Sequence, residues 1–298
     1  MLYKIILDNI MLTPLTPHNK KLLFKLLIIT LVSNFLFSIY SMLKVKKVVV
    51  FDLDETLGHF VELGMFWDAL NDYYKKKLPS SDFFQVLDIF PEFVRPHILT
   101  MLKYLVNKKS KKICDKVIIY TNNQGPRSWA KMISDYFNWK LKYKLFDEII
   151  AAFKVNGKQV EMCRTSHGKK HSDFLRCTNL PASTKVCFLD DQYHPHMDHE
   201  RVYYINFKPY IFEISFHEMA LRYYEQTKMD VDKNVFINHI VTFMKRYNFT
   251  PRIKSQEEQH IDKIVSKKTF GYLKSFFDNK PRKTRRLPKP KHRRSYKH

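Results

Sequence analysis

The stretch VVVFDLDETLG, residues 48–58, decides the fold, because three valines and a phenylalanine run directly into two aspartates. An apolar run of this kind, ended by acidic residues, indicates a strand buried in a parallel sheet. Side chains alternate along a strand, so Asp52 and Asp54 are expected on the same side. Open α/β sheets bind their ligands at the carboxyl ends of their strands. The pair therefore predicts a divalent-cation or acid/base site, with an ordinary surface turn as the alternative.

Short apolar segments alternate with helical patterns along the rest of the chain. Further strands are expected at 117–121, 146–150, 185–189 and 202–206, and helices at 97–107, 127–138 and 169–178. This alternation predicts the α/β class, a Rossmann-like three-layer α/β/α domain with a parallel sheet over residues 44–212. The aromatic-rich residues 57–94 lack a long period, which favours a flap or small cap. A helical extension is expected over residues 213–279.

The net charge of +23 over 298 residues comes largely from the two ends of the chain. Residues 280–298 contain ten Lys and Arg and no acid, so we expect a disordered basic tail suited to nucleic acid or another acidic partner. Residues 26–43 are eighteen uncharged residues, the lower limit for a membrane-spanning helix. For residues 1–43, a single-pass membrane anchor, a dispensable leader and a packed helix remain open.

The four cysteines form no CxxC pair: Cys114, Cys163, Cys177 and Cys187. Three lie in or beside apolar segments, which favours buried free thiols in a reducing compartment. A cytoplasmic or nuclear location is expected on this basis.

Polar clusters follow three of the expected strands, and their order along the chain resembles the haloacid-dehalogenase superfamily. Residues 52–56 match its DxDxT motif, and Thr121 matches the Ser/Thr that closes the second motif strand. Lys169 or Lys170 supplies the lysine that precedes the fourth motif, and residues 190–191 match the paired acids. The resemblance covers about residues 46–207 and implies the strand order 5-4-1-2-3.

The resemblance also implies a role for each motif residue. Asp52 would attack phosphorus and become an aspartyl phosphate, and Asp54 would act as the general acid and base. Mg²⁺ would be held by Asp52, Asp190, Asp191 and the backbone carbonyl of Asp54. The transferring phosphoryl group would be bound by Thr121, Asn122 and Lys169, with Lys170 as the alternative lysine.

Within the superfamily, the helix start at Arg95-Pro96 and the short cap region look like the RNA-polymerase-II C-terminal-domain phosphatases and the NLI-interacting-factor-like group. Versions from large DNA viruses and protists look most similar. This implies a phosphoprotein substrate with phosphoserine or phosphothreonine, such as an RNA polymerase tail. Two alternatives stay open: a polynucleotide or small-molecule phosphatase, and a non-catalytic basic binding protein that retains the fold.

Three further features carry weaker predictions. The spacing of His194, His196 and His199 invites a zinc site, although such a site usually needs a fourth ligand and a fixed scaffold; a loop beside the active site is the alternative. Arg95 would either pack internally or bind substrate. The aromatic residues of 57–94 would mainly form core, with Phe60 and Trp67 as candidates for an entrance to the site.

Overall fold

The computed structural model describes residues 16–43 and 45–278, which belong to two compact units, residues 1–45 and 46–298. In the first unit, the helix α2 spans Pro17–Leu43. Within the described residues no helix is long and apolar enough to cross a membrane, so the span expected over residues 26–43 is not found there. The basic tail expected over residues 280–298 lies outside the described residues.

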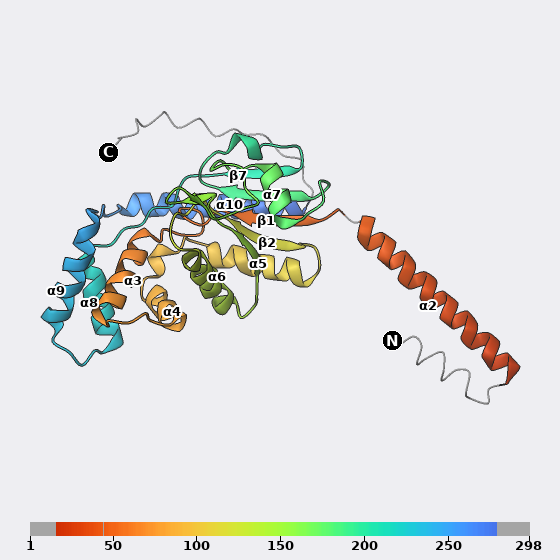
Figure 1. Ribbon diagram of the computed structural model, residues 1–298, viewed down its shortest axis with the longest axis horizontal. Helices are drawn as coiled ribbons and strands as arrows, with labels where there is room; N and C mark the ends of the chain where they lie inside the picture. The colour runs from red at the N-terminus through yellow and green to blue at the C-terminus, as the bar shows by residue number, and fades with distance from the viewer. Residues whose placement is uncertain (1–15, 44, 279–298) are drawn as a thin grey trace. The chain divides into compact units, whose positions relative to one another are not determined.

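The second unit is built on a five-stranded parallel sheet, as the sequence predicts (Figure 1). Its strands are β1 (Lys47–Phe51), β2 (Lys116–Tyr120), β3 (Phe146–Ile150), β6 (Lys185–Asp190) and β7 (Val202–Asn206). The order across the sheet is β3-β2-β1-β6-β7, with every neighbouring pair parallel. When the five strands are numbered 1 to 5 along the chain and the sheet is read from β7 to β3, the order is 5-4-1-2-3, so the expected strand order is confirmed. Because β1 lies in the centre, the aspartates that follow it sit at the middle of one sheet edge.

The alternation of side chains along β1 divides the core into two layers. Val49 and Phe51 belong to a large apolar cluster with α5 (Ile98–Ser110) and α6 (Arg127–Leu141). Val48 and Val50 face a smaller cluster that includes Phe174 of α7 (His171–Thr178). Figure 1 shows α5 and α6 on one side of the sheet and α7 on the other. The three-layer α/β/α arrangement is therefore confirmed.

Residues 57–94, expected as a flap or small cap without a long period, form the helices α3 (Val61–Tyr73) and α4 (Ser80–Ile89) and the short 3-10 helix η1 (Pro91–Phe93). A buried glutamate, Glu62, stands on the inner face of α3 and interrupts its apolar stripe, which hides the helical period. Phe60 and Trp67 are buried in the large cluster. Their interpretation as core is confirmed, and neither lines an entrance.

The helical extension after β7 is also present. It consists of α8 (Phe216–Thr227), α9 (Lys233–Met244), the 3-10 helix η3 (Lys245–Tyr247) and α10 (Gln256–Phe277). Buried side chains of all three α-helices join the large cluster. The extension therefore completes the same core that supports the sheet. Two further short elements, the β4–β5 hairpin (Lys154–Val155 and Lys158–Gln159) and the 3-10 helix η2 (Pro195–Met197), lie in loops that follow β3 and β6.

The prediction of four free cysteines is wrong for two of them. Cys114 and Cys187 are free and buried, as expected. Cys163 and Cys177 form a disulfide, with Cα atoms 5.0 Å apart. The pairing escapes the sequence because tertiary structure, rather than spacing, brings α7 beside the loop that carries Cys163. Only two of the four cysteines are therefore free thiols of the kind expected in a reducing compartment.

Candidate active site

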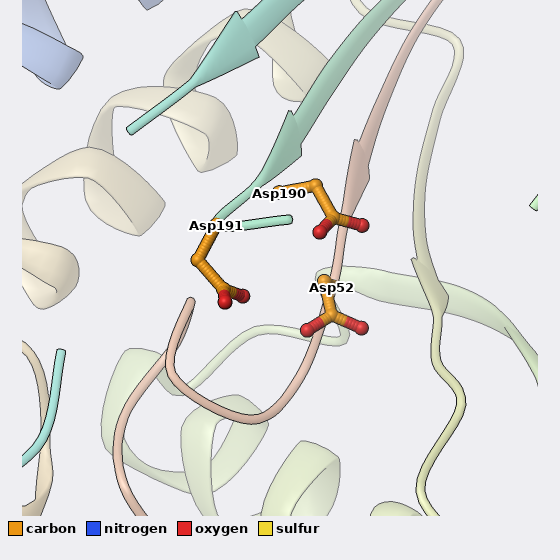
Figure 2. A group of neighbouring side chains, drawn as sticks. All are labelled: Asp52, Asp190 and Asp191. Atoms are coloured by element: carbon orange, nitrogen blue, oxygen red, sulfur yellow. The ribbon is translucent and has the colours of Figure 1, made fainter. Parts of the chain in front are cut away.

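Three carboxylates meet at the carboxyl edge of the sheet (Figure 2). Asp52 follows β1 directly, Asp190 ends the neighbouring β6, and Asp191 comes next. β1 and β6 are paired in parallel up to Phe51 and Leu189, and the Asp52 N–H donates to the Leu189 carbonyl at 2.9 Å. Asp52 and Asp190 therefore lie next to each other where the two strands end. Oxygen atoms of the three carboxylates all lie within 4.8 Å of one another. Within residues 16–43 and 45–278, no other group of His, Cys, Asp or Glu side chains is placed to share an ion.

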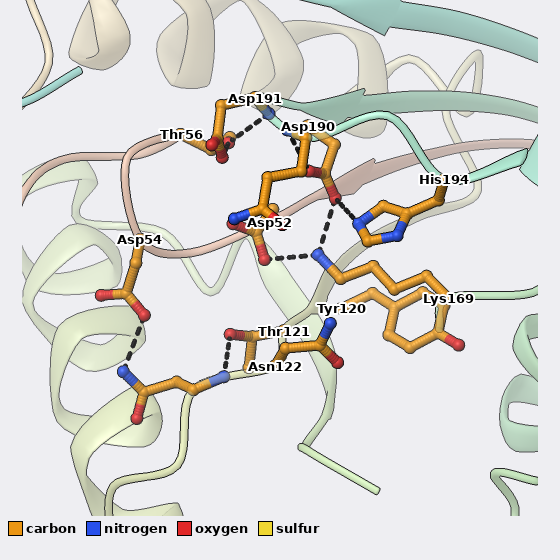
Figure 3. A network of polar contacts seen from close by, with 12 residues as sticks. Asp52, Asp54, Thr56, Tyr120, Thr121, Asn122, Lys169, Asp190, Asp191 and His194 are labelled. Atoms are coloured by element: carbon orange, nitrogen blue, oxygen red, sulfur yellow. Dashed lines mark hydrogen bonds and ion pairs between the residues drawn. The ribbon is translucent and has the colours of Figure 1, made fainter. Parts of the chain in front are cut away.

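Lys169 lies between two of these carboxylates (Figure 3). Its ammonium donates to Asp52 Oδ1 at 2.5 Å and to Asp190 Oδ2 at 2.6 Å, and its side chain is only 2% exposed. The rings of Tyr120 and Phe188 lie 5.8 Å from the same nitrogen. The ammonium of Lys170 instead donates to Thr165 Oγ1 at 3.2 Å. Of the two candidate lysines, the structure brings Lys169 to the aspartates.

The charges at this edge do not balance. Three carboxylates face one buried ammonium, and burial raises the pKa of Asp52 to about 8, with Lys169 opposing the shift and Asp190 adding to it. Burial, together with the nearby Asp190 and Glu55, raises the pKa of Asp191 to about 7. For Asp190, burial alone would raise the pKa, but Lys169 and His194 lower it. A divalent cation would supply the missing positive charge, and hard carboxylate oxygens are the ligands that Mg²⁺ prefers. The donor set therefore fits Mg²⁺.

Asp54 lies apart from the three clustered carboxylates. Its Oδ2 accepts a hydrogen bond from Asn123 Nδ2 at 2.7 Å, as Figure 3 shows. Burial raises the pKa of Asp54, and the hydrogen bond from Asn123 and the nearby His59 oppose that shift only in part. Thr121, at the end of β2, accepts from the Asn123 N–H at 3.0 Å, so the loop after β2 joins the predicted phosphate-binding residue to the predicted acid/base. A carboxyl with a raised pKa beside an amide is suited to transferring a proton.

Internal contacts fix the loop that carries both motif aspartates. Thr56 Oγ1 donates to Asp191 Oδ1 at 3.1 Å. The guanidinium of Arg95, which is 2% exposed, donates to the carbonyl oxygens of Thr56 and Glu55. A Cβ atom on Gly58 would lie 2.4 Å from the Phe93 carbonyl oxygen, so only glycine fits this close approach. Arg95 therefore packs internally, in agreement with the first of its two interpretations.

Arg164 is a site residue that the sequence did not reveal. Its guanidinium is buried and donates to the carbonyl oxygens of Thr121 at 3.0 Å and Ala151 at 2.7 Å. It also donates to the side chain of Asn122 at 2.7 Å and to the His167 carbonyl at 2.8 Å. It thus ties the loop after β2 to the loop that leads into Lys169. The Asn122 side chain accepts from Arg164, whereas the phosphate contact predicted for Asn122 comes from its backbone N–H and stays a prediction.

The three histidines proposed for zinc do not converge in the described part of the chain. His194 Nε2 lies 3.3 Å from Asp190 Oδ2, and His199 stacks on His171 with ring centroids 4.1 Å apart. The zinc interpretation is therefore not supported. His194 instead flanks the aspartate cluster, which agrees with the alternative prediction of a loop beside the active site.

Comparison of the chain with family models, with curated proteins and with solved structures finds no match. What the site can do is therefore argued from its own geometry.

Proposed function

We propose that this protein is a Mg²⁺-dependent phosphatase that works through an aspartyl-phosphate intermediate on Asp52. The observation that carries the proposal is the placement of Lys169 between Asp52 and Asp190 at the carboxyl edge of the sheet, 2.5 and 2.6 Å from their oxygens. A nucleophilic carboxylate must be ionised and must approach a dianionic substrate. Positive charge beside it lowers the pKa of the carboxylate and reduces its repulsion of the phosphate. A bound Mg²⁺ would be held by Asp52, Asp190 and Asp191 and would offset the charge of the phosphate.

The residues of the chain would divide the remaining work. An oxygen of Asp52 attacks phosphorus while the bond to the leaving oxygen breaks, and the Lys169 ammonium and the Thr121 hydroxyl hold the equatorial oxygens. Asp54 gives its proton to the leaving oxygen, a role that burial favours because it raises the pKa of this carboxyl above its ordinary value. The same carboxylate then takes a proton from the water that hydrolyses the phosphoaspartate. Asn123 holds Asp54 in position for both transfers.

The favoured substrate is a protein carrying phosphoserine or phosphothreonine, of which an RNA polymerase tail is one example. The segment after Asp54 supports this choice, because α3 and α4 contribute their aromatic side chains to the core, as expected of a segment that packs on the domain rather than forming a large separate cap. A site without such a cap suits a residue presented on a peptide chain. The resemblance of the motifs to the polymerase-tail phosphatases agrees with this choice.

The test is phosphate release from phosphoserine peptides, 5′-phosphorylated oligonucleotides and para-nitrophenyl phosphate, each with Mg²⁺ and with EDTA. We expect Mg²⁺-dependent release that is strongest on peptides and is abolished by Asp52→Asn. Asp135→Asn is the matched control, since Asp135 lies on the surface of α6 in an ion pair with Lys131. Activity that survives Asp52→Asn would refute the mechanism. Release from oligonucleotides alone would assign the same chemistry to a polynucleotide phosphatase, and no release from any substrate would favour a binding protein.

A further inference from the structure

A cavity of about 160 Å³ opens beside the candidate active site. Its walls are the start of α6, the chain that follows β3 and the β4–β5 hairpin. Most of its lining side chains are small and apolar, among them Ala130, Ala152, Val155 and Val160. A dry apolar cavity of about 150 Å³ accommodates a molecule of the size of benzene. The space therefore matches one aliphatic or aromatic side chain.

Two residues belong to both the cavity and the site, namely Thr121 and Asn123. Thr121 is the predicted phosphate-binding hydroxyl, and Asn123 holds the carboxylate of Asp54 at 2.7 Å. A group in the cavity would thus lie next to the leaving oxygen of a bound phosphoester. This continuity places the cavity where the residue adjacent to a phosphoserine would reach.

The polar groups of the lining are already engaged with the protein. The Asn123 side chain donates to Asp54 and accepts from the Gly125 N–H at 2.8 Å, and Thr121 Oγ1 accepts from the Asn123 N–H. Arg127, on the rim, lies 3.7 Å from Glu161. A nucleobase placed here would leave its own donors and acceptors without partners, which is costly in an apolar cavity. An apolar side chain has no such requirement.

The approach to the cavity is apolar as well. Val160 lines the cavity and is 44% exposed, and Met162, two residues further on, is 78% exposed. Exposed apolar side chains beside a cavity mark surfaces that bind a ligand or a partner. Met162 lies next to Cys163, and the disulfide from Cys163 to Cys177 anchors this end of the loop to α7.

We propose that this cavity binds an apolar side chain adjacent to the phosphorylated residue of a protein substrate. The inference rests on the proposed function and adds a sequence preference to it. The phosphoryl group sits at Asp52, and the neighbouring apolar side chain leaves water for the cavity. Removing this burial weakens binding of the peptide without touching the reacting groups.

The test compares phosphoserine peptides that differ only at the flanking positions, with leucine, proline, serine or aspartate on either side. We expect leucine or proline at one flanking position to raise kcat/KM about tenfold or more over serine, the scale for placing a whole apolar side chain in a pocket. Two variants address the cavity. Ala130→Leu fills it from α6, and Val160→Asp places a charge at its mouth on an already exposed residue. Val235→Asp is the matched control, on a valine of α9 that is 62% exposed and does not line the cavity.

In both cavity variants, the ratio of kcat/KM for the leucine or proline peptide to that for the serine peptide should fall to less than about threefold, mainly through a change in KM. Both should hydrolyse para-nitrophenyl phosphate at the wild-type rate. Val235→Asp should keep the preference. Wild-type protein that hydrolyses all peptides equally, or variants that retain the preference, would overturn the cavity assignment and leave the phosphatase intact. Loss of oligonucleotide hydrolysis in the variants, with peptides unaffected, would overturn it in favour of a nucleobase.

Binding of the same peptides in EDTA, followed by fluorescence anisotropy, separates the two proposals. Selective binding of the leucine or proline peptide in EDTA, together with no hydrolysis of any peptide in Mg²⁺, would support the cavity and refute the phosphatase. Equal binding of all peptides would refute the cavity whatever the activity.

Discussion

Replacing Lys169 with methionine tests the charge balance of the site directly. The substitution preserves most of the side-chain volume but removes the ammonium that lies 2.5 Å from Asp52 and 2.6 Å from Asp190. Near neutral pH without metal, Asp52 is largely protonated because burial raises its pKa to about 8, so Asp190 is the charge that loses its partner. Leaving a buried charge unpaired costs about 3–5 kcal/mol. Proton uptake by the carboxyls relieves part of this cost, so we expect a loss of about 3 kcal/mol.

In a domain of this size a loss of 1 kcal/mol lowers Tm by about 2–4 °C, so Lys169→Met should lower Tm in EDTA by about 6–12 °C. Lys170→Met is the matched control. Lys170 is the next residue and is half-buried, and its ammonium donates to Thr165 Oγ1 at 3.2 Å. It should change Tm by about 2 °C or less. Thermal unfolding followed by circular dichroism measures both variants.

Mg²⁺ adds a second, opposite readout. Without the ammonium the site has lost a positive charge that competes with a metal ion, so Mg²⁺ should raise the Tm of Lys169→Met by more degrees than it raises the Tm of the wild type. The same addition should shift Lys170→Met and the wild type equally. Equal losses in the two variants, or no larger Mg²⁺ shift in Lys169→Met, would refute the account of Lys169 as the cation that holds the aspartates together.

Three further predictions address other parts of the molecule. Asp54→Asn should lower the single-turnover rate of leaving-group release from a phosphoserine peptide by about 10²–10⁴-fold, and far less from para-nitrophenyl phosphate, whose leaving group needs no proton; equal losses in this first step would contradict its role as the acid. Burial raises the pKa of Glu62 to about 8, with the hydrogen bond from the Ile214 N–H opposing the shift and Glu213 adding to it, so the folded state holds this proton more tightly than the unfolded state does. Its contribution to stability is therefore lost as pH rises towards 8. The free energy of unfolding, measured in urea, should fall less between pH 5 and pH 8 in Glu62→Gln than in the wild type. An equal fall in the two proteins would show that Glu62 is not the source of this pH dependence. Joint replacement of Cys163 and Cys177 by serine should cost up to about 3 kcal/mol, and dithiothreitol should lower the Tm of the wild type but not that of the double variant; a wild-type Tm insensitive to the reductant would show that the disulfide contributes nothing.

The sheet and its polar edge were predictable because they rest on local patterns. Each strand is a short apolar run, and the parallel arrangement follows from the alternation with helices. The order β3-β2-β1-β6-β7 matches the order that the resemblance implies. The aspartates after β1 and β6 were placed correctly for the same reason, since neighbouring parallel strands end at one edge. The helices α3 and α4 were missed because burial of Glu62 and of many aromatic side chains hides the helical period.

The features that could not be predicted depend on contacts between distant parts of the chain. Nothing near Arg164 in the sequence indicates that its guanidinium would join the loop after β2 to the loop before Lys169. The choice between two adjacent lysines depends on which one enters the core as the chain turns into α7, and their identical side chains give no local signal. The disulfide was missed because spacing alone does not show that Cys163 and Cys177 lie side by side.

The position of Asp54 follows from the same charge balance that gathers the other three carboxylates. Asp52, Asp190 and Asp191 lie close enough to share one divalent ion, and a fourth carboxylate among them would add repulsion that one Lys and one Mg²⁺ could not offset. Asp54 is not part of this cluster, and Asn123 donates to its side chain at 2.7 Å. A neutral amide leaves the pKa raised, whereas an ammonium at that position would keep the carboxyl ionised. The two aspartates of the DxD motif therefore lie in different surroundings, Asp52 against the Lys169 ammonium and Asp54 against the Asn123 amide, and this difference is what the two proposed roles require.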